Sequence, residues 1–220
     1  MLELVVGNAI FLALMAGIFV PLEGWFPRAE SRMGARAVLL CVGLLFADVV
    51  AMEAVGGWIL DSLASLRSPA VDASGWRIAA VLVLAEVAGY WAHRMMHRAR
   101  WLWRFHALHH APATIHWLDA WRQHPVDFVI HGVIVGLPGA LLGASLADVG
   151  AVVLLRKTYT TFLHANLGWS LRWMEGWIAT PSFHAIHHSQ DPRDHDRNFA
   201  GMVPALDRIF GTLARQGAGR

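Results

Sequence analysis

The sequence predicts an all-α integral membrane protein with about four transmembrane segments, and three observations lead to this fold class. Of the 220 residues, 56% are hydrophobic and only 15% are charged, whereas about a quarter of the residues in a soluble domain are charged. Residues 2–20 contain a single charged side chain, that of Glu3, and are long enough to cross a hydrocarbon core, which requires about 20 residues. Arginines gather beside the apolar stretches, as is typical of loops on the cytoplasmic side of a membrane.

Four apolar regions give the order of the expected elements. They are residues 2–20, 35–60, 76–91 and 127–155. The first lacks the basic start and the small-residue cleavage site of a secretory signal, so we expect it to be retained. The last is interrupted at residues 142–148, where Gly143 and Ser145 indicate a turn, and this predicts a helical hairpin over residues 127–163. Residues 1–75 then form the N-terminal transmembrane helices and residues 76–220 a histidine-rich domain, within a single structural unit.

A hairpin returns the chain to the side of the membrane that it left, and this decides where the histidines lie. Arg28, Arg32 and Arg36 separate the first two apolar regions, which places their loop in the cytoplasm. The third region then returns to that side where His93 begins, and the histidines beyond the hairpin share it. We therefore expect a helical cap on the cytoplasmic face. The content of alanine and arginine suits a bacterial source, and hence the inner membrane.

Charge and cysteine content argue against two other kinds of site. The net charge is +2, and the basic residues flank apolar stretches instead of forming a polar face with interleaved aromatic residues, so no nucleic-acid partner is expected. The single cysteine, Cys41, excludes an intramolecular disulfide and a cysteine-based metal site.

Most of the 13 histidines fall in four short motifs. "HRMMH" places two of them four residues apart, on one helical face. "HALHH" and "HAIHH" share the spacing H-x-x-H-H, and "FLHAN" holds a single histidine. The motif histidines are His93, His97, His106, His109, His110, His164, His184, His187 and His188. One ion takes about three or four protein ligands, so this set indicates two ions, and the spacing leaves iron, zinc, copper and nickel open.

The same motifs, with the continuation "SQDPRDHDRNFAG" and the tail "LDRIFGT", resemble the fatty acid hydroxylase and sterol desaturase superfamily of membrane diiron enzymes over residues 91–212. The resemblance implies that the nine motif histidines hold two iron ions, with zinc as the alternative metal, and that O2 is a substrate. It adds His124 as a further candidate ligand and Asn198 and Asp207 as supporting residues. Leu206 departs from the family pattern, in which tryptophan often precedes the aspartate.

The reaction that the resemblance implies is hydroxylation of an unactivated C–H bond of a lipid, either a fatty acyl chain or a sterol-like molecule. Desaturation at the same centre stays open, and so does hydrolysis by a dizinc enzyme, for which Asp191, Asp194 and Asp196 would be candidate acids. A metal transporter would spread its ligands near the membrane midplane, and a membrane cytochrome would leave the H-x-x-H-H doublets unexplained.

Partners and supporting residues follow from the same interpretation. No heme, flavin or ferredoxin motif is visible in the sequence, so we expect a separate electron donor, a ferredoxin or a cytochrome with its reductase. Charged residues in apolar regions are costly and are therefore suspected of a role. Glu86 and the nearby Tyr90 are candidates for lining a pocket or orienting a ligand, and Asp48 and Glu53 are charged residues without an evident partner.

Trp169, Trp173 and Trp177 recur every four residues, and tryptophan prefers the headgroup level of a membrane. The spacing predicts a short helix over residues 168–179. This helix would either lie in the interface plane, with Arg172 and Glu175 facing water, or pack as an ordinary stripe.

Overall fold

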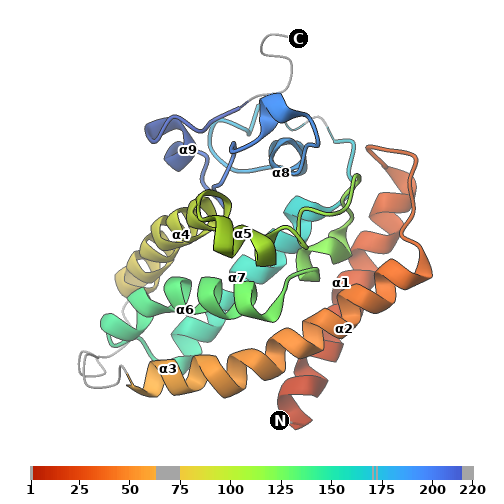
Figure 1. Ribbon diagram of the computed structural model, residues 1–220. Helices are drawn as coiled ribbons and strands as arrows, with labels where there is room; N and C mark the ends of the chain where they lie inside the picture. The colour runs from red at the N-terminus through yellow and green to blue at the C-terminus, as the bar shows by residue number, and fades with distance from the viewer. Residues whose placement is uncertain (1, 63–74, 170, 172, 215–220) are drawn as a thin grey trace.

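The computed structural model describes all residues except 1, 63–74, 170, 172 and 215–220. In this part of the chain every regular element is helical (Figure 1). The long helices are α1 (Leu2–Trp25), α2 (Ala35–Ala51), α4 (Gly75–Arg98), α6 (Pro125–Leu141) and α7 (Leu146–His164). The short ones are the π-helical η1 (Met52–Gly56), α3 (Gly57–Ser62), α5 (Arg100–His106), η3 (Trp117–Trp121), α8 (Pro181–His187), η4 (Pro192–Asp194) and α9 (Ala205–Ile209).

Three stretches of helix among the described residues are long and apolar enough to cross a membrane, namely Leu2–Trp25, Ala35–Gly56 and Ile78–Arg98. The fourth apolar region forms the expected hairpin of α6 and α7. The chain turns at Gly143, whose φ of 66° is easily adopted only by glycine. Ser145 then caps α7 by accepting a hydrogen bond from the Asp148 backbone N–H. The prediction of an all-α membrane protein is confirmed.

The third membrane helix continues beyond the end at residue 91 that hydropathy indicates. Helix α4 runs to Arg98, because neither proline nor glycine follows Gly89 within it. It ends where Ala99 adopts an extended conformation and begins α5. His93 and His97 therefore lie on the last two turns of α4, on one helical face.

All the histidine motifs lie on one side of the molecule. Figure 1 shows α5, α8 and α9 gathered near the C-terminal end of α4. The loop between α1 and α2 reaches this side too, since the backbone N–H of Arg28 donates to the carbonyl of Asn166 (3.0 Å) and Pro27 forms an isolated bridge with Leu167. The arginine-containing loop and the histidines thus share one face, as the hairpin argument requires.

The prediction of a helix over residues 168–179 is wrong. Residues 173–177 form turns, and Gly168 is tied to the α1–α2 loop by a hydrogen bond from its N–H to the carbonyl of Phe26. Glu175 accepts hydrogen bonds from Ser182 (2.5 Å) and Thr180 (3.2 Å) at the start of α8. Tertiary contacts therefore override the spacing of the tryptophans, and Arg172 lies outside the described residues.

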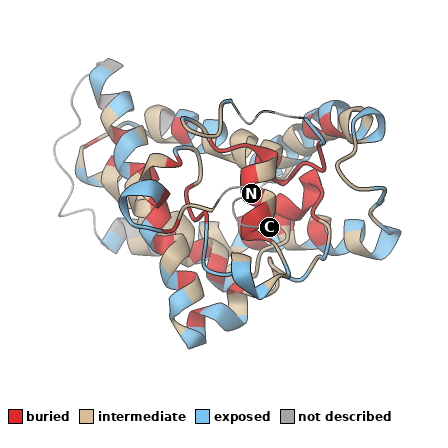
Figure 2. Cartoon of the chain, turned by 90° about the horizontal axis from the view of Figure 1, so that it is seen from above, coloured by how far each residue is buried: buried red, intermediate tan, exposed pale blue. Residues whose placement is uncertain are grey.

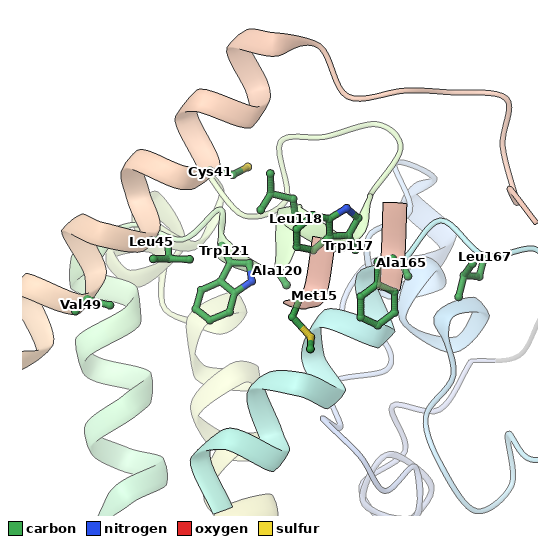
Figure 3. Packing of buried hydrophobic residues seen from close by; sticks show 11 residues of the cluster. Met15, Cys41, Leu45, Val49, Trp117, Leu118, Ala120, Trp121, Ala165 and Leu167 are labelled. Carbon is green, nitrogen blue, oxygen red and sulfur yellow. The ribbon is translucent and has the colours of Figure 1, made fainter. Parts of the chain in front are cut away.

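A core of buried residues joins the N-terminal helices to the remainder of the chain. Figure 2 shows buried residues gathered towards the middle of the molecule and exposed ones along its outer helices. In Figure 3 the side chains of Cys41 and Leu45 on α2 lie beside Leu118 and Trp121 of η3. Phe19 of α1 packs on the other tryptophan of η3, with ring centroids 6.3 Å apart. The division at residue 75 stays a prediction, but this core is built from both sides of it.

Candidate metal centre

Four elements deliver the motif histidines to one place. Helix α4 supplies two, α5 and the turn after it supply three, the last residue of α7 supplies one, and α8 with its C-cap supplies three. Helix α8 begins at Pro181 because Thr180 accepts a hydrogen bond from the Phe183 backbone N–H and because proline fits the first helical position.

The histidines form two groups, each with potential ligand atoms within 4.8 Å of one another. The five-histidine group consists of His93, His97, His106, His110 and His187. The four-histidine group consists of His109, His164, His184 and His188. Each group could hold a metal ion, and together they contain all nine motif histidines.

The hydrogen bonds of His164 show that its group suits a cation. Its Nδ1 donates to the carbonyl of Thr160 (2.8 Å), so its Nε2 carries a lone pair. That Nε2 faces the Nε2 atoms of His109 at 3.0 Å and His184 at 3.2 Å. One lone pair cannot accept well from both rings, whereas nitrogens that bind one ion at about 2.0–2.1 Å lie roughly 3.0–3.4 Å apart. The spacing is that of ligands around a shared ion.

The five-histidine group repeats this pattern. His93 donates through Nδ1 to the carbonyl of Phe199 (2.9 Å), and His187 donates through Nδ1 to the carbonyl of Arg197 (2.7 Å). The Nε2 atoms of both rings, and that of His97, are buried with no hydrogen-bond partner among the described residues. Buried acceptors of this kind are costly unless something satisfies them. The residues present therefore fit a metal ion in each group.

Burial keeps five of these imidazoles neutral. It lowers the pKa of His184, His187 and His188 well below the usual range, and neighbouring imidazoles lower it further. Burial lowers the pKa of His109 and His110 in the same way. Neutral rings have the free lone pair that metal binding requires.

One carboxylate orients a member of the five-histidine group. His106 Nδ1 donates to Asp127 Oδ2 at 2.9 Å, and both residues are buried. A carboxylate behind a metal-binding histidine fixes the ring and raises its basicity. Asp127 stands in the first turn of α6, so this contact ties the hairpin to the centre.

Both groups open onto one largely apolar cavity of about 240 Å³ between α4, α6 and α7. Two histidines of the five-histidine group and three of the four-histidine group line it. Val135, Val153 and Leu163 contribute aliphatic walls, and Lys157 contributes a charged group. The cavity can therefore present a hydrocarbon chain to both groups.

A second opening, a polar cleft of about 550 Å³, reaches only the five-histidine group. His97, His110 and His187 line it together with the exposed His195 and Asp196. An Asp196 carboxylate oxygen lies 3.5 Å from His97 Nδ1. The centre thus has an apolar side and a polar side.

His124 lies outside both groups. Its Nδ1 accepts a hydrogen bond from the Val126 backbone N–H and so caps α6, and its ring lies 4.8 Å from that of Phe105. Asp194 and His195 also lie outside both groups, in and just after η4.

The remaining supporting candidates hold the cap and the cavity wall in place. Asn198 is fully buried and joins α8 to the tail by donating to the carbonyls of Phe183 and Ala214. Asp207 accepts hydrogen bonds from the backbone N–H groups of Phe199 and Ala200, both at 2.8 Å.

Glu86 and Tyr90 support the cavity from behind without lining it. Glu86 pairs with Arg156, which does line the cavity, and accepts a hydrogen bond from the Met202 N–H. The Tyr90 hydroxyl shares a hydrogen bond with Thr212 at 2.8 Å.

Sequence reasoning missed Asp127 and Lys157. Neither belongs to a repeated motif, so spacing gave no signal for them. The signal that was present is the charge itself, since each ionisable group stands beside apolar residues in a membrane-associated hairpin, where it is expensive.

The fold and the site define a class of protein, helical membrane proteins that carry a two-centre histidine site at one face. A family model described as fatty acid hydroxylase matches residues 78–212, which is more than half of the chain and includes both histidine groups. The chain belongs to this family, and the resemblance drawn from the motifs is confirmed.

Curated relatives agree with the family. An alkylglycerol monooxygenase of Danio rerio is 29% identical over 71% of this chain and 34% of its own length. The ornithine lipid hydroxylase OlsE of Rhizobium tropici is 32% identical over 60% of this chain and 40% of its own. The very-long-chain aldehyde decarbonylase GL1-2 of Oryza sativa subsp. indica is 32% identical over 94% of this chain and 34% of its own. The chain thus spans well under half the length of these relatives. No solved structure matches.

Proposed function

We propose that this chain is a membrane-bound, O2-dependent diiron monooxygenase that hydroxylates an unactivated C–H bond of a lipid. The observation that carries the proposal is that two groups of buried or half-buried imidazoles open onto one apolar cavity. Iron ions held by the nine motif histidines would supply O2 activation, in which one oxygen atom enters the C–H bond and the other leaves as water, with two electrons from a separate reductant and two protons from solvent.

The residues of this chain perform the binding, the orientation and the exclusion of water. Backbone carbonyls and Asp127 accept hydrogen bonds from the Nδ1–H groups and so aim the Nε2 atoms inward. Aliphatic side chains of α6 and α7 hold the lipid chain beside the histidines. The four-histidine group is closed off from the polar cleft, which limits access of water to that side.

Hydroxylation is favoured over desaturation because named relatives are monooxygenases and a hydroxylase. The relatives' names refer to alkylglycerols, an ornithine lipid and very-long-chain aldehydes, so the substrate is sought among all membrane lipids. The electron donor is a separate protein, a ferredoxin or a cytochrome with its reductase. The arginine-containing loop on the histidine side supports a cytoplasmic active site, in the inner membrane of a bacterium.

Metal analysis joined to product analysis tests the proposal. Protein purified in detergent from cells grown with iron is expected to contain about two irons per chain, and His109→Ala and His187→Ala are each expected to lose iron. His195→Ala, outside both groups, is the matched control. Membranes of expressing cells supplied with isotopically labelled O2 are expected to contain labelled hydroxylipids that the two variants lack.

Other outcomes identify the rival activities. Alkenes without label would indicate a desaturase. Zinc without iron, from an anaerobic and iron-rich preparation, would indicate a hydrolase and would overturn the proposal.

A further inference from the structure

Lys157 is a half-buried cation at the wall of the apolar cavity. It stands on α7 two helical turns before His164, about 10 Å deeper along the helix axis. Its Nζ lies 4.5 Å from the ring centroid of Trp121 and 4.4 Å from that of Phe128. Within the described part of the chain, no carboxylate forms an ion pair with this ammonium group and no oxygen is hydrogen-bonded to it.

The two aromatic rings satisfy only part of what an ammonium group needs. Each cation–π contact contributes about 0.5–2 kcal/mol, but the group has three N–H donors, and a donor that faces an apolar cavity without an acceptor is costly. Since Lys157 lines the cavity, an acceptor that enters the cavity can accept a hydrogen bond from its ammonium group. An apolar hydrocarbon alone would leave them unsatisfied.

The charges around Lys157 indicate what kind of acceptor fits. Asp48 and Asp127 are both within electrostatic reach of it, and Asp48 is 1% exposed with neither carboxylate oxygen hydrogen-bonded to a described residue. Asp48 does not line the cavity. The other cation of the wall, Arg156, is already paired with Glu86. The Asp127 carboxylate, which accepts from His106, would repel an anionic ligand near Lys157. An uncharged oxygen can accept a hydrogen bond from the ammonium group without that repulsion.

We propose that Lys157 is a specificity-determining residue that donates a hydrogen bond to an uncharged oxygen of the lipid, a hydroxyl, ether or carbonyl oxygen. This inference rests on the proposed function, because it treats the cavity as the substrate site. The oxygen anchors the substrate two helical turns below His164, and aliphatic residues such as Val135 and Leu163 direct the adjoining chain towards the histidines. The C–H bonds presented to the centre are then those at a fixed distance along the chain from that oxygen.

Equilibrium binding to the purified, metal-loaded protein tests the inference. The probes are radiolabelled dodecane, 1-dodecanol and dodecanoate, which share a chain and differ in the terminal group. Protein-free micelles give the partitioning of each probe into detergent. The wild type is expected to prefer dodecanol to dodecane beyond this partitioning.

Lys157→Met is expected to lower the affinity for dodecanol about 10- to 100-fold, the range for a hydrogen bond to a charged group, and to leave dodecane within about twofold. Thr158→Ala is the matched control, because Thr158 is the next residue of α7 and does not line the cavity. Metal content, measured for each variant, reports whether the centre is intact. If Lys157→Met does not fold, the wild-type preference relative to micelles and the Lys157→Gln variant, which keeps a neutral donor, provide the test.

Three results overturn the inference. They are a wild type that binds dodecanol and dodecane alike, a preference that survives Lys157→Met, and a Lys157-dependent preference for dodecanoate, which would mean an anion site. The readout is binding, so its failure is separable from that of the proposed function. Labelled hydroxylipids without Lys157-dependent selectivity would remove only this inference, whereas selectivity without iron or product would remove only the monooxygenase.

Discussion

The two histidine groups use the same side chains in different surroundings. All members of the four-histidine group are buried and none lines the polar cleft. In the five-histidine group three members are only partly buried, and His97, His110 and His187 line that cleft. Of these two openings, the four-histidine group lines the apolar cavity alone, whereas the five-histidine group lies between the cavity and the polar cleft.

The two groups also differ in the number of their ligands and in the groups that orient those ligands. The five-histidine group has one ligand more than the usual three or four, and a carboxylate orients one of them. The four-histidine group lies within this range, and the ring of His164 is oriented by the backbone carbonyl of Thr160. The two groups should therefore respond differently to the same perturbation.

The largest difference is expected from removing one histidine from each group. His164→Ala leaves three imidazoles in the four-histidine group, whereas His110→Ala leaves four in the other. The first variant should fall to about one metal per chain and lose product formation more than about 100-fold, while the second should retain more metal. Elemental analysis and product quantification measure both effects.

His124→Ala is the control for that comparison, since His124 caps α6 outside both groups. It should keep both metals. Equal metal loss in His164→Ala and His110→Ala would contradict the idea that the number of remaining imidazoles decides metal retention.

Asp127→Asn should weaken the five-histidine group alone. The substitution keeps an oxygen that can accept from His106 but removes the charge that raises the basicity of the ring. Loss of such a partner costs about 10- to 100-fold in metal affinity. Titration of the metal-free protein against a competing chelator should show one weakened site and one unchanged site, and a uniform loss at both would refute the assignment.

Chelators should remove the two metals at different rates. The polar cleft gives a chelator access to the five-histidine group, whereas the structure around the four-histidine group must first open locally. An opening that costs about 1.4 kcal/mol already separates the rates about tenfold. Wild-type protein should lose metal in two phases, and His164→Ala should show the fast phase only. A single phase in the wild type would mean that the cleft gives no selective access.

The fold followed from the sequence wherever one local rule was sufficient. Hydropathy identified the membrane helices, and Gly143 with Ser145 identified the hairpin turn. The rule failed at residues 168–179, where a tryptophan spacing that suits a helix is overridden by contacts of Gly168 and Glu175 with other parts of the chain. Those contacts join residues far apart in the sequence, so no local pattern could reveal them.

The site shows the same limit at finer scale. In both H-x-x-H-H motifs the outer pair, four residues apart, enters one group and the middle histidine enters the other. The outer pair of the first motif joins the five-histidine group, but that of the second joins the four-histidine group. The spacing of four residues places the outer histidines on one helical face, so that they enter the same group. It could not predict the exchange, because the tertiary arrangement of the two motifs decides which group each pair faces.

The smallest difference between the groups is expected at Asn198, which supports both. Helix α8 and its C-cap contribute to both groups, and Asn198 fixes this segment through two donated hydrogen bonds and one accepted from the Ala214 N–H. Its φ of 56° is left-handed, so Asn198→Gly removes only the hydrogen bonds, whereas Asn198→Ala adds backbone strain. We expect about 3 kcal/mol of destabilisation from the glycine variant and about 1 kcal/mol more from alanine. Thermal unfolding measures both values, and metal occupancy should fall equally in the two groups because the whole of α8 is loosened. Loss confined to one group would mean that α8 does not move as a unit, and that the two centres are positioned independently.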